Sequence, residues 1–333
     1  MTRPYLTTLG HVRQWLAISG NPVTQISNAD PCVVTVANHG RVMGNQIGLD
    51  NIIGPVQLNA RIFTIGTVIN PNQFELLGVD STTLPTYAGG GSMFVSDPLL
   101  QRLISSASAY IQTWLNRVFL DAHYVETRDG QGNPTMVLAN GPVISITSLS
   151  IDGVNVPPRG PLTPPTGIPS GYTWEDRTLK LTGYRFCRGF SNVAINYRAG
   201  YLQADEPHDI PAGLQMVTDR AWFGDRGVTY ANGALFVEVP SAPAAGQYAL
   251  TANGTYLFNA ADAGAAILVS YSVVPDDVEQ ACIEMIGLRF KEMDRIGITG
   301  KTIGTETVHF SSADMTASTK TLLQQYRRVS PIL

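Results

Sequence analysis

The most suggestive chemical motif in this sequence is the glycine-rich stretch Gly297-Ile-Thr-Gly-Lys-Thr302. Its last three residues match the end of a phosphate-binding loop, in which backbone N–H groups and a lysine hold nucleotide phosphates. The motif also needs a glycine where this chain has Arg295, and it must join a strand to a following helix. Here the pattern predicts a helix before the stretch and an extended segment after it. We therefore interpret the stretch as a flexible linker.

Other catalytic signals are weak. The five histidines lie on separate expected elements, and no two have the spacing of metal ligands. The sequence has no Gly-x-Ser-x-Gly elbow, although a triad defined by geometry could still assemble from distant residues. The neighbouring carboxylates Asp276 and Asp277 are typical of the start of a helix. We expect no catalytic residue, no metal site and no cofactor, and we expect that the chain is not an enzyme.

The charge balance also excludes several classes of protein. With 22 Lys+Arg against 26 Asp+Glu, the chain has no excess of basic residues for gripping nucleic acid. Charged residues are 14% of the chain, against ~25% in average soluble proteins. Such a surface is common where neighbouring subunits cover much of the exterior. The longest apolar stretch, near 265–274, is too short for a membrane helix, and the first residues lack the apolar core of a secretion signal.

The three cysteines, Cys32, Cys187 and Cys282, lie far apart in the sequence. Their spacing gives neither a disulfide framework nor a metal motif, so we expect buried thiols in a reducing compartment. Near the end of the chain, Tyr326 precedes two arginines. These residues could contact phosphates or simply end a helix, but Tyr and Arg are enriched at interface hot spots, so we favour a protein contact.

The elements that must position these residues are of two kinds. Asp97-Pro98 is a helix-start signature, and the apolar stripe from Leu100 to Val118 after it predicts a long helix. Residues 22–95 and 212–272 carry few charges and alternate short β-branched runs with turn signals, which predicts two all-β modules. Four helices are expected, at about residues 7–16, 97–118, 275–295 and 316–329.

Several stretches together resemble the head–tail connector proteins of long-tailed bacteriophages, also called adaptor or head-completion proteins. The resemblance depends on the order and content of these stretches over roughly half of the chain, and no single stretch is specific. They are Leu6–Ile18, Asp97–Arg117, Pro142–Gly153, Val274–Gly297, Gly304–Thr307 and Leu323–Val329.

The two β segments depart from that family. Residues 22–95 resemble a small β domain best known from ubiquitin-activating enzymes and also found in phage structural proteins, but they contain none of those enzymes' catalytic residues. Residues 212–272 resemble another β module of phage virion proteins. The stretches that carry these two resemblances are Ala29–Val36, His39-Gly40, Leu58-Asn59, Phe63–Ile65, Phe74–Leu76, Gly246–Tyr248 and Gly254–Gly264.

The adaptor resemblance implies an α+β fold: a small α-helical bundle with a β-hairpin arm, interrupted by two inserted all-β modules. The adaptor core would be discontinuous, made of residues 1–21, 96–211 and 273–333, with 22–95 and 212–272 as the insertions. The resemblance further implies a ring of about twelve copies, since a heterologous interface that closes on itself generates a ring.

The same resemblance implies a structural virion protein of the neck, at the head–tail junction, assembled in the cytoplasm of a bacterial host. The ring would lie under the portal protein and extend the DNA channel. Its partners would be the portal, the next neck protein (a stopper or tail terminator) and genomic DNA that passes through the lumen without sequence recognition. No membrane partner is expected.

The resemblance also implies that the segment from about Lys301 to Leu333 leaves the bundle and docks on the portal. In the other interpretation, its helix folds back on its own bundle. The flexible arm would comprise Gly297, Gly300 and Gly304, and the portal interface would comprise Leu322, Leu323, Tyr326, Arg327 and Arg328.

An alternative function of a different class is a carbohydrate- or receptor-binding decoration protein of the tail or neck, built on the two β modules. That function would require exposed aromatic side chains on the modules. The residues expected to provide them are Trp222, Phe223, Tyr256 and Phe258.

Overall fold

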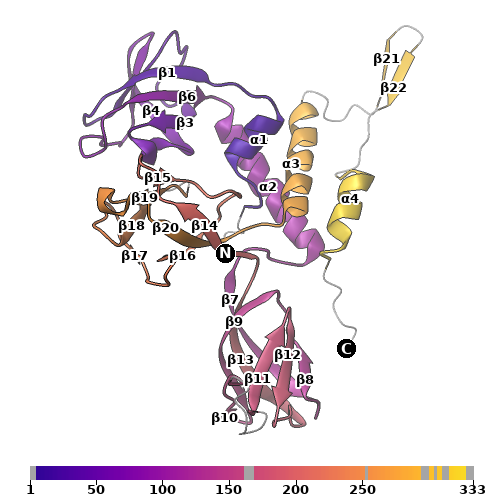
Figure 1. The fold of residues 1–333 in the computed structure, drawn as a ribbon. Coiled ribbons are helices and arrows are strands. Elements are labelled where there is room, and N and C mark those ends of the chain that lie inside the picture. Colours follow the sequence, from indigo (N-terminus) through magenta and orange to yellow (C-terminus); the bar gives the residue numbers. More distant parts are fainter. Residues whose placement is uncertain are drawn as a thin grey trace.

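The computed structural model describes residues 5–160, 169–251, 254–293, 300–303, 306–309 and 315–327. Within these ranges the protein is a mixed α+β molecule in which strands greatly outnumber the four helices (Figure 1). The predicted α+β class is confirmed, but the chain as a whole is not a helical bundle. The reason is local: short runs rich in β-branched residues between turns recur through the sequence outside the four helices.

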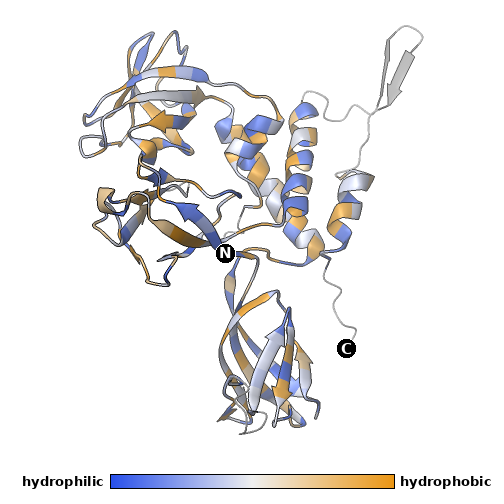
Figure 2. Cartoon of the chain, viewed as in Figure 1, coloured by the Kyte–Doolittle hydropathy of each residue, from blue (hydrophilic) through white to orange (hydrophobic). Residues whose placement is uncertain are grey.

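The helices form one small group around a shared hydrophobic cluster. The first helix begins after Thr8, whose side chain accepts a hydrogen bond from His11 N, and the second ends at Asn116 in the left-handed conformation. Figure 2 shows hydrophobic and hydrophilic residues interspersed along each of them, as expected for helices with one face inside. The helices are α1 (Leu9–Trp15), α2 (Asp97–Leu115), α3 (Asp276–Lys291) and α4 (Ala317–Gln324).

A closed barrel lies between α1 and α2 in the sequence and beside them in space (Figure 1). Its strand order is β1-β2-β5-β4-β3-β6, so the last strand returns to pair with the first, and its core is separate from that of the helices. Closure leaves no free sheet edge. The strands are β1 (Asn21–Ile26), β2 (Val33–Val36), β3 (Gln46–Ile53), β4 (Arg61–Asn70), β5 (Gln73–Leu76) and β6 (Gly89–Phe94).

The predicted β-hairpin arm is a larger unit than a hairpin. It projects away from the helices and has two sheets, of orders β10-β9-β13-β7 and β11-β12-β8, around a core of its own (Figure 1). Its strands are β7 (Ala122–Gly130), β8 (Thr135–Val137), β9 (Val143–Ile151), β10 (Val154–Asn155), β11 (Gly171–Glu175), β12 (Thr178–Thr182) and β13 (Gly189–Ala199).

The second β module begins earlier than residue 212. Strand β14 pairs with β20, so residues from Leu202 onwards, assigned from the sequence to the core, belong to the sheets of this module. The long-range pairing overrides the proline signal at Pro211, which predicted the boundary. The strands are β14 (Leu202–Asp209), β15 (Gln215–Met216), β16 (Asp225–Tyr230), β17 (Val237–Glu238), β18 (Gln247–Leu250), β19 (Tyr256–Phe258) and β20 (Ala266–Ser272).

Two further strands, β21 (Gly300–Ile303) and β22 (Glu306–His309), pair with each other between α3 and α4. Among the described residues, no helix is long and apolar enough to cross a membrane. The barrel, the arm, the second module and the helical group each have a hydrophobic cluster of their own.

Candidate functional site at the C-terminal helix

Helix α4 lies against α3 and does not leave the helical group. Leu323 is 0% exposed and belongs to the cluster that α1, α2 and α3 share. At the start of the helix, Thr316 caps Thr319 N, and the Thr319 hydroxyl donates to Glu284 Oε2 of α3 over 3.1 Å. The prediction that this helix leaves the bundle is therefore wrong for the structure of this chain, and the folded-back interpretation is correct. Although α4 has few apolar residues, it packs on α3 because Leu323 is buried and Thr319 is hydrogen-bonded to Glu284.

The end of α4 is held by Tyr326. The Tyr326 ring packs edge-on against Phe119, with 5.8 Å between ring centroids, and edge-on against Tyr201, with 6.4 Å between centroids. Its hydroxyl lies 3.5 Å from Asp277 Oδ2, which also accepts a hydrogen bond of 3.0 Å from Gln325. Burial raises the pKa of Tyr326, and the nearby charge of Asp277 raises it further. The tyrosine is therefore a neutral anchor between α4 and the N-terminus of α3.

The other predicted portal-interface residues have different surroundings. Leu322 is half-buried, whereas Leu323 points into the cluster and offers no surface to a partner. Arg327 is exposed, and its Cζ lies 5.4 Å from the centroid of the Trp114 ring. Arg328 lies outside the described residues. The structure therefore brings Leu322, Tyr326 and Arg327 together at the surface of the helical group.

The flexible arm that the sequence predicts at Gly297, Gly300 and Gly304, which is not the β arm, is only partly described. Gly297 and Gly304 lie outside the described residues, and Gly300 is the first residue of strand β21. The Gly300-Lys301-Thr302 match to a phosphate-binding loop thus falls in a strand that pairs with β22, without a helix directly after it.

Sequence reasoning missed the residues that hold α4. Glu284 contacts α4, and Asp277 and Phe119 contact the two residues that follow it, but none of the three stands near α4 in the sequence. The sequence indicates Asp277 only as a helix-start acid, and Asp277 does lie in the first turn of α3. No local spacing connects residue 277 with residue 326, so no sequence signal was available.

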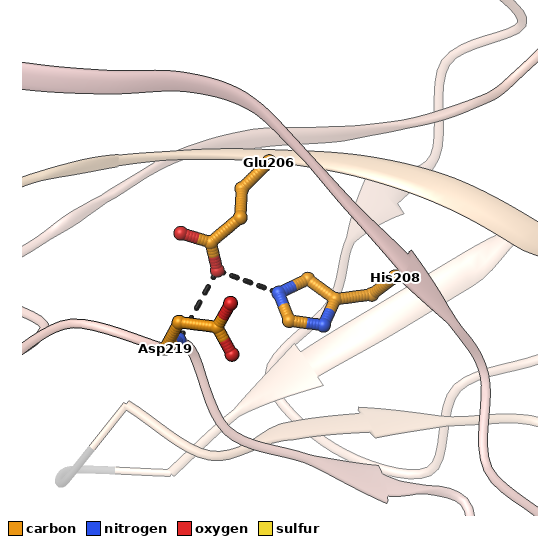
Figure 3. Close-up of side chains that lie close together, drawn as sticks. All are labelled: Glu206, His208 and Asp219. Carbon is orange, nitrogen blue, oxygen red and sulfur yellow. Dashed lines mark hydrogen bonds and ion pairs between the residues drawn. The ribbon is translucent and has the colours of Figure 1, made fainter.

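A second cluster of titratable groups lies in the second β module (Figure 3). Glu206 and His208 are two residues apart on β14, so both side chains project from the same face of the strand. His208 Nε2 lies 2.6 Å from Glu206 Oε1, and the backbone N–H of Asp219 donates to the same oxygen over 3.1 Å. The Tyr271 hydroxyl donates to the other carboxylate oxygen.

Burial of Glu206 would by itself raise its pKa, but the hydrogen bonds from Tyr271, His208 and the Asp219 backbone together lower it. Imidazole and carboxylate groups are metal ligands, and their ligand atoms lie within 4.8 Å of one another here. Both oxygens of Glu206 already accept hydrogen bonds, however. We therefore assign the cluster to holding the loop around Asp219 against β14. The spacing of Glu206 and His208 on one strand was the missed signal.

The aromatic residues on which the decoration-protein alternative depends are not surface platforms. Tyr256 is 0% and Phe258 4% exposed, and both belong to the core of the second module. Trp222 and Phe223 are half-buried, and the Trp222 ring N–H donates to the Tyr256 hydroxyl over 3.1 Å. These residues are therefore not free to stack on a sugar.

The cysteine expectation holds in part. Cys32 and Cys282 are buried, and burial raises the pKa of the Cys282 thiol to about 12. Cys187 is exposed at the far end of the arm, so the expectation of three buried thiols is wrong for this residue. All three cysteines are free thiols.

No protein-family model and no curated protein sequence matches this chain. The resemblance to phage adaptors therefore depends on the sequence stretches given above. The adaptor function that it implies is a proposal.

Proposed function

We propose that this chain is a structural subunit of a phage neck, a head–tail adaptor that forms a ring under the portal, extends the DNA channel and joins head to tail. The observation that carries the proposal is the helical group itself. Its helices come from chain segments that the β units separate, and they occur in the order of the stretches that resemble the adaptor family.

Contacts within the helical group support a single core. The backbone N–H of Leu6, before the barrel, donates to the Ser108 hydroxyl of α2, after it, over 3.0 Å. Ser108 in turn lies 3.8 Å from the Cys282 sulfur of α3. The chain thus leaves this core for the barrel and returns to it with α2, then passes through the arm and the second module in succession and returns with α3. This path suits a common core whose surface loops accept insertions.

The outline of the molecule also suits a subunit with several neighbours. The arm, the barrel and the second module extend from the helical group in different directions (Figure 1). Large apolar side chains are exposed on more than one of these units, for example Met43 on the barrel and Phe190 on the arm. Together with the low content of charged residues, this supports a protein whose surface is covered by copies of itself and by other virion proteins.

The decisive experiment counts copies in purified virions. Quantitative mass spectrometry of intact particles should find this chain and the portal protein in equal numbers, and cryo-electron microscopy should place it at the neck as a ring of about twelve subunits. A copy number far from that of the portal, or a location on the capsid surface or at the tail tip, would contradict the proposal. A tail-tip location would instead favour the receptor-binding alternative.

A further inference from the structure

Three arginines from separate parts of the chain line one small pocket, where the helical group meets the arm. Arg117 follows α2, Arg177 lies in the turn between β11 and β12, and Arg327 follows α4. The pocket has a volume of about 210 Å³. Its other polar side chains are Asn140, Gln325, Tyr326 and one acidic residue, Asp176.

Two of the three guanidinium groups are held in place by aromatic rings. The Cζ atom of Arg117 lies 5.3 Å from the ring centroid of Tyr201 and 5.6 Å from that of Phe119. Arg117 Nη2 also donates to Gly141 O over 2.5 Å. Arg327 lies over Trp114. Such contacts restrict the side chains, so that a ligand binding here would order few further torsions.

The positive charge of this pocket is not compensated within the described residues. None of the three arginines forms an ion pair with a carboxylate there, whereas Arg13 and Arg198 each do. Three arginines face one aspartate in the lining, although the whole chain has a net charge of −4. An incoming carboxylate would gain charge-assisted, forked hydrogen bonds from guanidinium groups that form no ion pair with another described residue.

We propose that this pocket binds an acidic segment of a partner protein, with a carboxylate side chain held between Arg117, Arg177 and Arg327. A concave pocket of this size admits a side chain, and the arginine, tyrosine and tryptophan around it are the residue types that dominate protein interfaces. Duplex DNA fits the site less well, since DNA that must slide through a channel is hindered by a pocket that grips single groups. The inference deepens the portal contact of the proposed function, and it depends on that function for the identity of the partner and for the argument against DNA.

Binding of a fluorescein-labelled octaglutamate peptide to the purified full chain tests the pocket directly. Octaglutamate should bind saturably and octaglutamine should not. Arg177→Gln and Arg327→Gln should each weaken octaglutamate binding roughly tenfold, while Arg188→Gln, at an exposed arginine on the arm, should leave it unchanged. Arg117→Lys keeps the positive charge but loses the planar guanidinium that can donate two parallel hydrogen bonds to a carboxylate, so it should also weaken octaglutamate binding. Unchanged melting temperatures would show that the variants are folded.

Three results would overturn the inference. The first is equal octaglutamate binding by the Arg177→Gln, Arg327→Gln and Arg188→Gln variants. The second is tighter binding of a short random-sequence DNA duplex with the same dependence on the arginines, which would assign the pocket to nucleic acid. The third is displacement of octaglutamate by a synthetic peptide of residues 328–333, which would assign it to the chain's own C-terminal segment. None of these results changes the copy number in virions, so the pocket and the adaptor proposal fail separately.

Discussion

Arg13 and Asp97 form a buried ion pair, with 3.1 Å between Nε and Oδ1, although the whole barrel separates them in the sequence. Their side chains are 5% and 1% exposed. The same guanidinium donates to Asp50 Oδ2 of β3 over 2.9 Å and lies 3.9 Å from the centroid of the Phe94 ring. One side chain of α1 therefore joins the start of α2 to the wall of the barrel.

The fit around this pair is tight. A Cβ atom on Gly48 of β3 would lie 1.7 Å from Asp97 Oδ2, so the barrel approaches α2 closely only because residue 48 has no side chain. This contact fixes the position of the inserted barrel on the helical group.

Arg13→Met should destabilise the protein by about 3–5 kcal/mol, because it leaves the buried carboxylate of Asp97 and the half-buried carboxylate of Asp50 without their cation. Urea denaturation measures the free energy of unfolding. The double variant Arg13→Met/Asp97→Asn should recover part of the loss, since it removes one of the stranded charges. Equal stability of Arg13→Met and wild type would show that the ion pair does not hold the barrel.

Stability should fall as the pH rises from about 4 to about 6, through the titration of Asp97. Burial raises the folded-state pKa of Asp97 from 3.8 to about 6, with Arg13 opposing and Asp50 adding to the shift. The folded state then binds the proton of Asp97 more tightly than the unfolded state does. The stabilisation that this gives is fully present below the unfolded-state pKa of 3.8 and is lost above the folded-state pKa of about 6. Its size is on the order of 1–3 kcal/mol.

Asp97→Asn should flatten that part of the pH profile in urea denaturation. An unchanged slope in the variant would assign the pH dependence to other groups.

Glu206→Gln should weaken the loss of stability in acid. The hydrogen bonds that Glu206 accepts hold its folded-state pKa below the usual value of 4.5, so its stabilisation is present above that value and lost as the pH falls. The variant should cost about 1–3 kcal/mol at neutral pH, because a charge-assisted acceptor is removed. Thermal melts at several pH values measure both effects. The same acid sensitivity in variant and wild type would contradict the assignment.

A chelator should leave the melting temperature unchanged, because the protein's own donors satisfy Glu206 in the cluster with His208 and Asp219. Differential scanning fluorimetry with and without EDTA measures this. A drop of several degrees that added zinc restores would show that the three side chains hold a metal after all.

Leu323→Ala should cost about 2–4 kcal/mol and release α4, since Leu323 is the apolar contact of that helix with the shared cluster. Leu322→Ala is the matched control on the same helix, and it should cost less than about 1 kcal/mol because its side chain is half-buried. Hydrogen exchange of the α4 amides measures the release. Equal exchange in both variants would mean that Leu323 does not hold the helix.

Replacing residues 24–93 by a short Gly/Ser bridge should leave a folded helical group and arm. Asn21 pairs with Met93 in the barrel, so the two ends of the insertion lie side by side and a short bridge spans them. Circular dichroism and thermal melting of the shortened chain measure the outcome. Loss of the cooperative transition would show that the barrel is part of one folding unit with the helices.

Local features of this protein followed from the sequence. The Asp97-Pro98 start and the apolar stripe after it predicted α2, and β-branched runs between turn residues predicted an all-β module where the barrel lies. These signals act over a few residues, because helix and strand periodicity depends only on neighbours along the chain. The mixed α+β class follows from them.

The tertiary structure decided the rest. That α4 folds back on α3, that Arg13 meets Asp97, and that Arg117, Arg177 and Arg327 share a pocket are facts about residues from distant segments. Each of these contacts depends on how the helices and the β units pack against one another. The spacing of residues along the chain carries no information about such packing. Glu206 and His208 stand between the two cases. Their shared strand face was readable from the sequence, whereas the Tyr271 hydroxyl that completes the cluster comes from a strand that only the folded sheet brings beside them.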